Sequence, residues 1–230
     1  MAKIEEKKGS IFDSECQTIV NTVNCKGFMG KGIALDYRYR YPDMFDEYKK
    51  QCEDGEIRIG KLTIWKGSKP WIINFPTKND WKYPSKIEYI ESGLDFFVDH
   101  YKSWNIESIA FPRIGSTHGG LDWHNVKKVM YEKLNKLDLY VEIYEFDPKY
   151  SDKLFVMLTN KLKEMNVEEC KIKIGIRIKD AQNLKEGIKR GEICSFSEIQ
   201  RLGGFGETSM LKLYAFANRE EAHFQTKLTG

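Results

Sequence analysis

The sequence predicts an α/β protein that carries a smaller second domain. In the first 150 residues, short apolar segments alternate with segments whose apolar residues recur at helical spacing, as in layered α/β domains. With 230 residues, of which 41% are hydrophobic, the chain is long enough to bury a sizeable core. The turn sequence Phe146-Asp147-Pro148-Lys149-Tyr150 ends the first pattern, and a different one follows it.

The first half of the α/β domain reads as one strand, two helices and two further strands. Residues 17–20 are a short apolar run, which predicts a strand. Residues 31–41 and 42–52 are predicted helices, and the second opens with a proline, which the first helical turn tolerates. Residues 61–65 and 71–75 are apolar and aromatic, and they predict two more strands.

The second half continues this alternation. Residues 85–101 have apolar side chains at a spacing that fits one face of a helix. Residues 108–111 form a buried type of strand, residues 122–137 a helix with Asp122 as its candidate N-cap, and residues 140–146 a final strand.

Residues 151–230 are predicted to form a small α+β domain. Residues 154–165 have a helical pattern, whereas residues 170–178 place an isoleucine at every second position, as a strand does. Residues 210–216 are a second expected strand. The run Gly203-Gly204-Phe205-Gly206 lacks the lysine and the spacing of a P-loop and predicts a turn. The sequence shows no internal repeat.

Composition excludes several classes of protein. The 37 basic and 34 acidic residues leave a net charge of +3, too small an excess to favour strong nonspecific binding to nucleic acids. No apolar run approaches the ~18 residues of a membrane span. The five cysteines form no C-x-x-C pair and no apolar signal region precedes them, which favours reduced thiols in the cytoplasm. The four histidines lack metal-ligand spacing, so we expect neither a metal nor a cofactor.

Two glycine-rich loops share a design. Residues 25–33 and residues 112–123 each leave a strand and enter a helix. Backbone N–H groups at such turns, together with the helix dipole, bind phosphate without a cationic side chain. For either loop alone, glycines that only relieve turn strain are the simpler explanation. Taken together, and with Asn21 and Asn24 at the base of the first, the loops favour a ligand with two phosphates.

A third loop offers a lysine at the same expected edge of the sheet. Lys78 follows the strand over residues 71–75, within Asn74-Phe75-Pro76-Thr77-Lys78-Asn79-Asp80-Trp81. A surface lysine is ordinarily solvated, but a lysine can also attack an anomeric carbon or stand as a cation beside a leaving group. Position decides between these roles.

Four segments of the chain, in collinear order, resemble the macrodomain of DarG-type antitoxins. The antitoxins belong to DarT–DarG systems, in which DarT is an ADP-ribosyltransferase that modifies bases in single-stranded DNA. The likeness spans residues 3 to 147 and rests on Val20–Cys25, Met29–Leu35, Asn74–Lys78 and Gly119–Trp123. It implies a three-layer α/β/α macrodomain with a mixed sheet over residues 1–148, which binds ADP-ribose at the carboxyl ends of its strands.

The resemblance also implies roles for individual residues. Asn24 would contact the distal ribose and Ile11 would lie beside adenine, while the two glycine loops would cradle the diphosphate. Lys78 falls on the lysine that is catalytic in the DarG-like branch and in the related human terminal ADP-ribose protein glycohydrolase, where it engages the anomeric carbon of the distal ribose. The expected ADP-ribose contacts are Ser10, Ile11, Asn21, Asn24, Gly30, Lys31, Gly32, Ile33, Gly115, Ser116, Thr117, His118, Gly119 and Gly120.

This chain departs from the family pattern at several of these positions. Ser10 stands where many macrodomains carry an aspartate that binds adenine. Thr117 replaces a glycine in the second loop, and a β-branched residue resists positive φ. The sequence therefore leaves open whether this loop keeps the geometry of the family. His118 replaces a polar amide and is a candidate to hold substrate, donate a proton or cap the loop. The human relative's loop aspartate aligns with Gly119, and Asp122 is better explained as an N-cap, so we nominate no catalytic aspartate.

Two tryptophans at the ends of these loops are candidates for stacking. Trp81 and Trp123 are placed to stack on adenine or on a modified base, as aromatic faces do on single strands.

The function that this sequence favours is a hydrolase that removes ADP-ribose from nucleobases of DNA, with Lys78 as its catalytic residue. Two alternatives stay open: a non-catalytic ADP-ribose reader, and a hydrolase of ADP-ribosylated glutamate in proteins. The expected partners are ADP-ribosylated single-stranded DNA and, by analogy with DarG, a transferase of the DarT type engaged by residues 151–230. The expected location is the cytoplasm.

Overall fold

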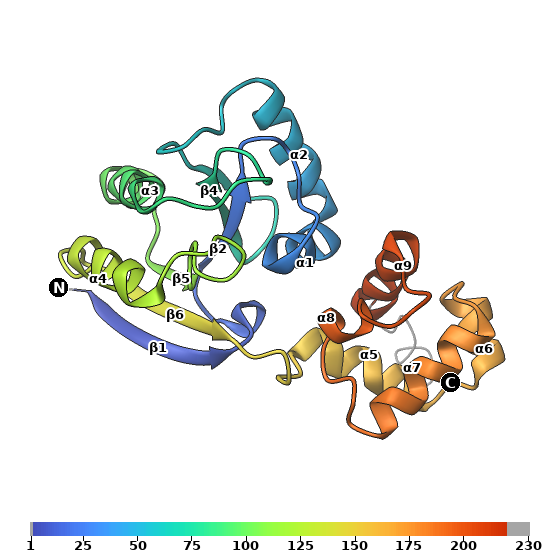
Figure 1. Cartoon of the computed structure of the whole chain (residues 1–230). Coiled ribbons are helices and arrows are strands. Elements are labelled where there is room, and N and C mark those ends of the chain that lie inside the picture. The colour runs from blue at the N-terminus through green and yellow to red at the C-terminus, as the bar shows by residue number, and fades with distance from the viewer. Residues whose placement is uncertain (1, 220–230) are drawn as a thin grey trace, which may run out of the picture. The chain divides into compact units, whose positions relative to one another are not determined.

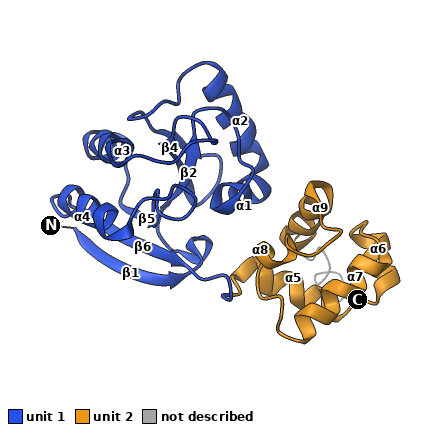
Figure 2. Cartoon of the chain, viewed as in Figure 1, with its two compact units in different colours: residues 1–150 blue, residues 151–230 orange. Residues whose placement is uncertain are grey.

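The computed structural model describes residues 2–219 and divides after Tyr150 into two compact units. Unit 1 comprises residues 1–150 and unit 2 residues 151–230 (Figure 2). Residues 220–230 of the predicted second domain lie outside the described part of the chain.

Unit 1 is built on a six-stranded mixed sheet of strand order β1-β6-β5-β2-β4-β3. The strands are β1 (Lys3–Gly9), β2 (Thr18–Asn24), β3 (Thr63–Trp65), β4 (Trp71–Lys78), β5 (Ser108–Pro112) and β6 (Tyr140–Phe146). All neighbouring pairs are parallel except β3 with β4. The carboxyl ends of the five parallel strands therefore meet at one edge of the sheet.

Helices cover both faces of this sheet, which confirms the three-layer architecture (Figure 1). α1 (Gly32–Arg40) and α2 (Pro42–Glu53) lie on one face, and α3 (Ile87–His100) and α4 (Trp123–Leu134) on the other. Successive residues of a strand face opposite helical layers. Ile73 packs in the core on the α3/α4 side, whereas Ile72 packs in the core on the α1/α2 side. This alternation follows from the two-residue period of a strand.

Each strand and helix predicted in residues 1–148 is present, with ends shifted by a few residues. β2 and β4 are longer than expected and continue to Asn24 and Lys78, so these polar side chains end the strands themselves. β1 was not predicted, because Lys3–Gly9 is rich in lysine and glutamate and lacks an apolar run. It forms an edge strand on β6, where charged residues are common.

A buried carboxylate ties β1 to β6. Glu142 is only 2% exposed and accepts hydrogen bonds from Lys7 Nζ, from Ser14 Oγ at 2.6 Å and from Tyr140 OH at 3.1 Å. Burial acts to raise the pKa of Glu142, but these donors outweigh it and leave the pKa below its ordinary value. The charged network anchors an edge strand whose own residues bury little apolar surface.

Unit 2 is helical throughout its described part, so the predicted α+β fold of this domain is wrong. Its helices are α5 (Lys153–Lys163), α6 (Val167–Lys173), α7 (Ile178–Lys189), α8 (Phe196–Ile199) and α9 (Glu207–Asn218). The helix predicted over residues 154–165 is present as α5. The two predicted strands are not.

The predicted strand over residues 170–178 is instead a helix end, a turn and a helix start. α6 ends at Lys173, and Gly175 takes a positive φ of 79° while its N–H donates to the Lys171 carbonyl. Ile174 and Ile176 are buried on either side of this glycine, whereas Ile172 is 81% exposed. The isoleucines therefore alternate across a turn, and their spacing of two is not that of a strand.

The predicted strand over residues 210–216 lies within α9. Its buried residues are Met210, Leu213, Tyr214 and Ala217, at intervals of three and four. This helical period becomes visible only over the full length of α9, since a window of seven residues spans less than two turns.

Candidate ADP-ribose site

The residues predicted to bind a ligand converge on the carboxyl edge of the unit 1 sheet. Ser10 and Ile11 follow β1, Asn24 ends β2, Lys78 ends β4, and the loop over residues 113–122 follows β5. Asn24 and Lys78 are register partners on neighbouring strands. Open α/β sheets place ligands at this edge.

The sheet is weakly joined where the two glycine loops leave it. β2 pairs with β4 along its whole length, but with β5 only at Thr18–Ile109 and Ile19–Ala110. Beyond these two pairs, β2 and β5 are no longer hydrogen-bonded to each other. The first glycine loop leaves β2 and the second leaves β5, so the loops stand on either side of this split.

Asn24 organises the first glycine loop. Its Nδ2 donates to the Phe28 carbonyl at 2.5 Å, and its Oδ1 accepts from the N–H of Lys26 at 2.9 Å. The Asn24 carbonyl also accepts from Tyr48 OH at 2.7 Å. Asn24 therefore uses most of its hydrogen-bonding groups to hold the conformation of the loop. Only the second hydrogen on Nδ2 remains for a ribose hydroxyl.

Asn21 lies deeper in the same strand. It is fully buried, and its Nδ2 donates to Asn74 Oδ1 of β4 at 3.1 Å. The predicted direct contact of Asn21 with ADP-ribose does not fit this burial. Its position suits the support of the Asn24 loop from below.

The two helices that follow the glycine loops begin in different ways. α1 has Lys31 at its N-cap with no side-chain cap, and its first residue, Gly32, has a φ of 59°. At α4, the Asp122 carboxylate accepts from Asn125 N–H at 3.1 Å, which confirms Asp122 as an N-cap. The start of α1 keeps its N–H groups for an anion, whereas Asp122 already occupies the start of α4.

The segment from Lys78 to Ser85, called the lysine loop below, is joined to the second glycine loop through two consecutive carbonyl groups. Lys78 Nζ donates to the His118 carbonyl at 2.7 Å, and Ser85 N–H donates to the Gly119 carbonyl at 2.9 Å. Because the C=O and N–H of a trans peptide point in opposite directions, both contacts turn the following N–H groups away from the lysine loop. Lys78 thus lies at the meeting point of all three loops.

His118 bridges the two glycine loops. Its imidazole lies over Gly32, where a β-carbon would come within 2.5 Å of His118 Cδ2 and 2.9 Å of Nε2. A side chain at position 32 would collide with this ring. Of the three roles predicted for His118, which are to hold substrate, donate a proton or cap the loop, this geometry best fits the cap.

Neither departure in the second loop strains its backbone. Thr117 has no positive φ, and among residues 2–219 the single non-glycine residue with positive φ is Asn105. At Gly119 a β-carbon would come within 3.0 Å of the Gly115 carbonyl oxygen and of Ser85 Oγ. The loop therefore accepts Thr117 but has no room for an aspartate at position 119.

The adenine side of the predicted site is apolar and aromatic. Ile11 is 3% exposed, and Ser10 caps the short 3-10 helix Ile11–Asp13 by accepting from Phe12 N–H at 3.4 Å. Phe12 lies 4.8 Å from Tyr37 between ring centroids, and the Arg40 guanidinium lies 4.0 Å from the Phe12 ring. Phe12 was not among the residues that the sequence predicted for this site, because it lies outside the four segments that carry the family resemblance.

Aromatic side chains also stand beside the lysine loop. Phe28 and Trp81 are 58% and 49% exposed, with ring centroids 5.6 Å apart. Trp81 follows β4 and Ile11 follows β1, on opposite sides of β2 and β5 in the sheet order, so Trp81 is far from the adenine side. Trp123 packs against the core, and the Arg113 guanidinium lies 4.9 Å from its ring, so it is less available for stacking.

Cysteine and metal chemistry find no support at this edge. Burial raises the pKa of the Cys25 thiol to about 11, so it is protonated at neutral pH. Within residues 2–219, His, Cys, Asp and Glu side chains form no group that could hold a metal ion. In the same part of the chain, no helix is both long and apolar enough to cross a membrane.

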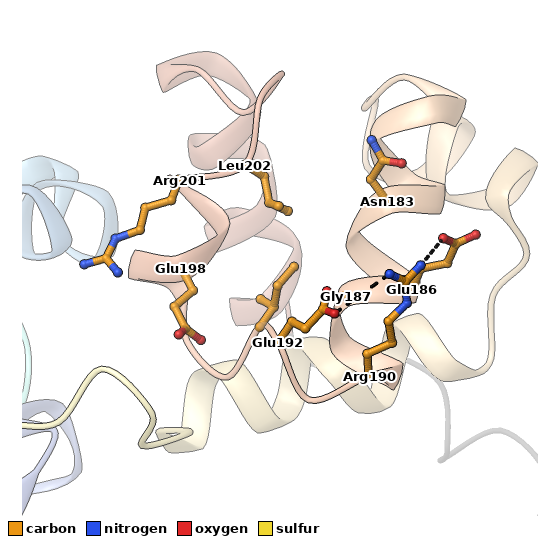
Figure 3. Close-up of a pocket in the computed structure, with 9 residues that line it drawn as sticks. Asn183, Glu186, Gly187, Arg190, Glu192, Glu198, Arg201 and Leu202 are labelled. Carbon is orange, nitrogen blue, oxygen red and sulfur yellow. Dashed lines mark hydrogen bonds and ion pairs between the residues drawn. The ribbon is translucent and has the colours of Figure 1, made fainter.

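Unit 2 has a separate cavity of about 470 Å³, between α7 and the segment around α8 (Figure 3). Its charges pair with each other: Arg190 lies 3.0 Å from Glu186 and 3.8 Å from Glu192. Glu198 accepts from Cys194 N–H at 2.5 Å. The Arg201 guanidinium points away from the other lining residues (Figure 3). Because Arg190, the arginine inside the cavity, already pairs with glutamates, it offers little attraction for an anionic ligand there.

Comparison with known proteins agrees with this geometry. Residues 20–130 match the model of the family described as Macro domain. The DNA ADP-ribosyl glycohydrolase of Thermus aquaticus is 36% identical over 160 residues, which cover 68% of this chain and 44% of that protein. The chain therefore spans less than half the length of this curated relative.

Two solved structures extend the comparison. The macrodomain of Mycobacterium tuberculosis DarG is 40% identical, with a TM-score of 0.62, and the match covers 64% of this chain and all of that one. Thermosipho africanus DarTG in complex with ADP-ribose is 36% identical, with a TM-score of 0.58, over 61% of this chain and 41% of that one. Both matches are similar in extent to unit 1.

Proposed function

The chain belongs to the macrodomain family, and from this and its site we propose that it hydrolyses the bond between ADP-ribose and a nucleobase of DNA. The observation that carries the proposal is the position of Lys78. It ends β4 beside Asn24 and contacts the second glycine loop at the His118 carbonyl. The names of the similar proteins, a DNA ADP-ribosyl glycohydrolase and a DarTG bound to ADP-ribose, support the same substrate.

In this proposal ADP-ribose lies along the carboxyl edge of the sheet. Adenine packs beside Ile11 and Phe12, and the diphosphate lies between the uncapped start of α1 and the loop over residues 115–120. The distal ribose then reaches Asn24 and Lys78. The exposed Phe28–Trp81 pair stacks on the modified base, in preference to Trp123.

The proposed reaction consumes one water and gives ADP-ribose and the unmodified base. The bond that breaks joins the anomeric carbon of the distal ribose to the base, which leaves with the bonding electron pair and takes up a proton. Lys78 engages the anomeric carbon as this bond breaks, and water supplies the oxygen of the product. Orientation of the ribose by the three loops is the main contribution of the remaining site residues.

Substitution of Lys78 tests the proposal. We expect Lys78→Ala to lower release of ADP-ribose from a modified oligonucleotide by about a hundredfold or more, as loss of a covalent or acid–base catalyst does. Binding of free ADP-ribose, measured by calorimetry, should persist because the diphosphate loops remain. Lys102→Ala, an exposed lysine after α3, is the matched control. Full turnover by Lys78→Ala would show that the mechanism is wrong.

A non-catalytic reader is the second candidate. It is favoured by the hydrogen bonds that already engage Lys78 Nζ and the amide of Asn24. Tight binding of ADP-ribose without product from modified DNA, modified protein or terminal ADP-ribose phosphate would establish it. Parallel assays on ADP-ribosylated DNA and ADP-ribosylated glutamate distinguish the remaining alternative, a protein hydrolase.

The partners and location are part of the same proposal. The chain acts on ADP-ribosylated single-stranded DNA and pairs functionally with an ADP-ribosyltransferase of the DarT type, which the name DarTG of a similar structure supports. A cytoplasmic location follows if its substrate is the cell's own DNA. Pull-down of the transferase by the full chain, compared with residues 1–150, tests whether unit 2 is the contact.

A further inference from the structure

Unit 2 contains two helical hairpins of the same design, which the sequence had not revealed. In one, α6 turns through Gly175-Ile176-Arg177 into α7, and in the other α8 leads through Gly204-Phe205-Gly206 into α9. The turn glycines both have positive φ, 79° at Gly175 and 100° at Gly204. The equivalent buried positions, at one constant offset, are Ile176 and Phe205, Ala181 and Met210, and Leu184 and Leu213. Between residues 167–189 and 196–218, only three aligned positions are identical, Glu169/Glu198, Gly175/Gly204 and Leu184/Leu213, so the repeat is hidden in the sequence.

Each turn packs against the second helix of the other hairpin. A β-carbon on Gly204 would lie 2.5 Å from Asp180 Oδ1 and 2.8 Å from an Arg177 nitrogen, at the start of α7. In the reciprocal contact, Lys212 Nζ of α9 donates to the Gly175 carbonyl at 2.9 Å. The two turns are therefore side by side, with Arg177 and Lys212 next to them.

The residues around these turns carry a surplus of positive charge. Within residues 171–179 and 201–212, six side chains are cationic: Lys171, Lys173, Arg177, Lys179, Arg201 and Lys212. One acidic side chain, Glu207, lies within these ranges, and four more flank them: Glu168, Glu169, Asp180 and Glu198. Glu169 pairs with Lys173, and the buried Asp180 pairs with Arg177. The exposed charge of the turns is thus cationic on balance.

An exposed isoleucine stands among these cations. Ile172 is 81% exposed between Lys171 and Lys173, the largest exposure among the large hydrophobic residues of the described chain. Such a side chain gains from burial against an apolar surface, and proteins insert isoleucine beside bases or sugars of DNA. An apolar side chain flanked by lysines suits a partner that is anionic and also has apolar rings.

We propose that this twin-hairpin face, formed by residues 171–179 and 201–212, binds the sugar–phosphate backbone of DNA. The lysines contact phosphates, which holds the strand on this face without reading its base sequence. DNA is favoured over an acidic protein because its sugars and bases lie directly beside a row of phosphates. This arrangement matches Ile172, an apolar side chain that lies between two lysines. This role goes beyond hydrolysis: unit 1 recognises ADP-ribose, while unit 2 binds the strand without regard to modification.

Binding of unmodified oligonucleotides to the full chain tests the proposal. Fluorescence anisotropy with labelled single-stranded and duplex DNA measures affinity across salt concentrations. We expect Lys171→Glu/Lys179→Glu to weaken binding by about tenfold or more and to reduce the salt slope by about 2, because two phosphate contacts are lost. Ile172→Ala should weaken binding while leaving the salt slope unchanged.

Lys163→Glu/Lys189→Glu is the matched control, since it makes the same change of charge at exposed lysines of α5 and α7 away from the turns. Equal effects of the two double variants, or no binding by the wild-type chain at low salt, would overturn the proposal. Unchanged DNA affinity with loss of binding to the transferase would overturn it in favour of a protein partner. Calorimetry with ADP-ribose reports on unit 1 separately, so failure here is distinct from failure of the proposed hydrolysis.

Discussion

At the scale of single residues, Gly119 limits the chemistry that the second loop can carry. The related human enzyme places an aspartate at the aligned position, but here a β-carbon would collide with the Gly115 carbonyl and with Ser85 Oγ. The missing carboxylate is therefore excluded by packing as well as by sequence. If the chain is a hydrolase, Lys78 has to act without an acidic partner from this loop.

The same packing predicts the effect of a small substitution. We expect Gly119→Ala to destabilise the chain by about 1–3 kcal/mol, as overpacking does, because one of the crowded atoms belongs to the backbone. ADP-ribose binding should weaken with it. Chemical denaturation and calorimetry measure the two effects.

Gly30→Ala is the control for stability, because nothing lies within 4 Å of a β-carbon there. Its free energy of unfolding should change by less than about 0.5 kcal/mol. Equal stability of Gly119→Ala and Gly30→Ala would contradict the crowding seen at the second loop.

Residue-level prediction from the sequence succeeded for positions and failed for contacts. The motifs placed Asn24, Lys78 and the glycine loops at one edge, because parallel strands end there. They did not show that Asn21 is fully buried, that His118 lies over Gly32 or that Phe28 pairs with Trp81. These contacts join separate loops, and no local pattern in the chain encodes them.

At the scale of elements, the two helices that follow the glycine loops differ at their N-termini. α1 begins without a side-chain cap, whereas α4 begins at an aspartate that caps it. A carboxylate at the start of α4 repels a phosphate there, so in the proposed site the anion is held by one helix and one loop. The sequence suggested two equivalent cradles because both loops are rich in glycine.

Replacement of the cap separates its structural role from a catalytic one. Asp122→Ala should lower the free energy of unfolding by about 1 kcal/mol, the usual loss for an N-cap, with turnover within about twofold of wild type. Asp122→Asn keeps an acceptor and should recover most of that stability. A large loss of turnover without loss of stability would instead identify Asp122 as catalytic.

Elements in unit 1 were predicted well because their apolar periods are distinct and their lengths ordinary. In unit 2, isoleucines at every second position spanned a helix end and a turn, so a period of two arose without a strand. Edge strand β1 was missed for the opposite reason, since its position on β6 depends on Glu142 and Lys7 across the sheet.

At the scale of the whole molecule, each unit has its own core. Both hydrophobic layers of unit 1 are made from residues before Tyr150, and unit 2 packs around α5, α7 and α9. The proposed tasks divide in the same way, with ADP-ribose recognition in unit 1 and strand binding in unit 2.

Truncation tests this division. We expect residues 1–150 to fold alone and to bind ADP-ribose within about threefold of the full chain, as an independent domain does. If unit 2 holds the strand, KM for a modified oligonucleotide should rise while kcat stays close to that of the full chain. Calorimetry and steady-state kinetics measure these quantities. Loss of ADP-ribose binding in the fragment would show that unit 2 completes the site.

The short pairing between β2 and β5 has a mechanical consequence. Two residue pairs join the half-sheet β1-β6-β5 to the half-sheet β2-β4-β3, and the proposed diphosphate site lies across that seam. A ligand that contacts loops from both halves adds a second connection between them and opposes their separation. In the proposed site, bound ADP-ribose would therefore link the two halves of the sheet, and release of the product would remove that link.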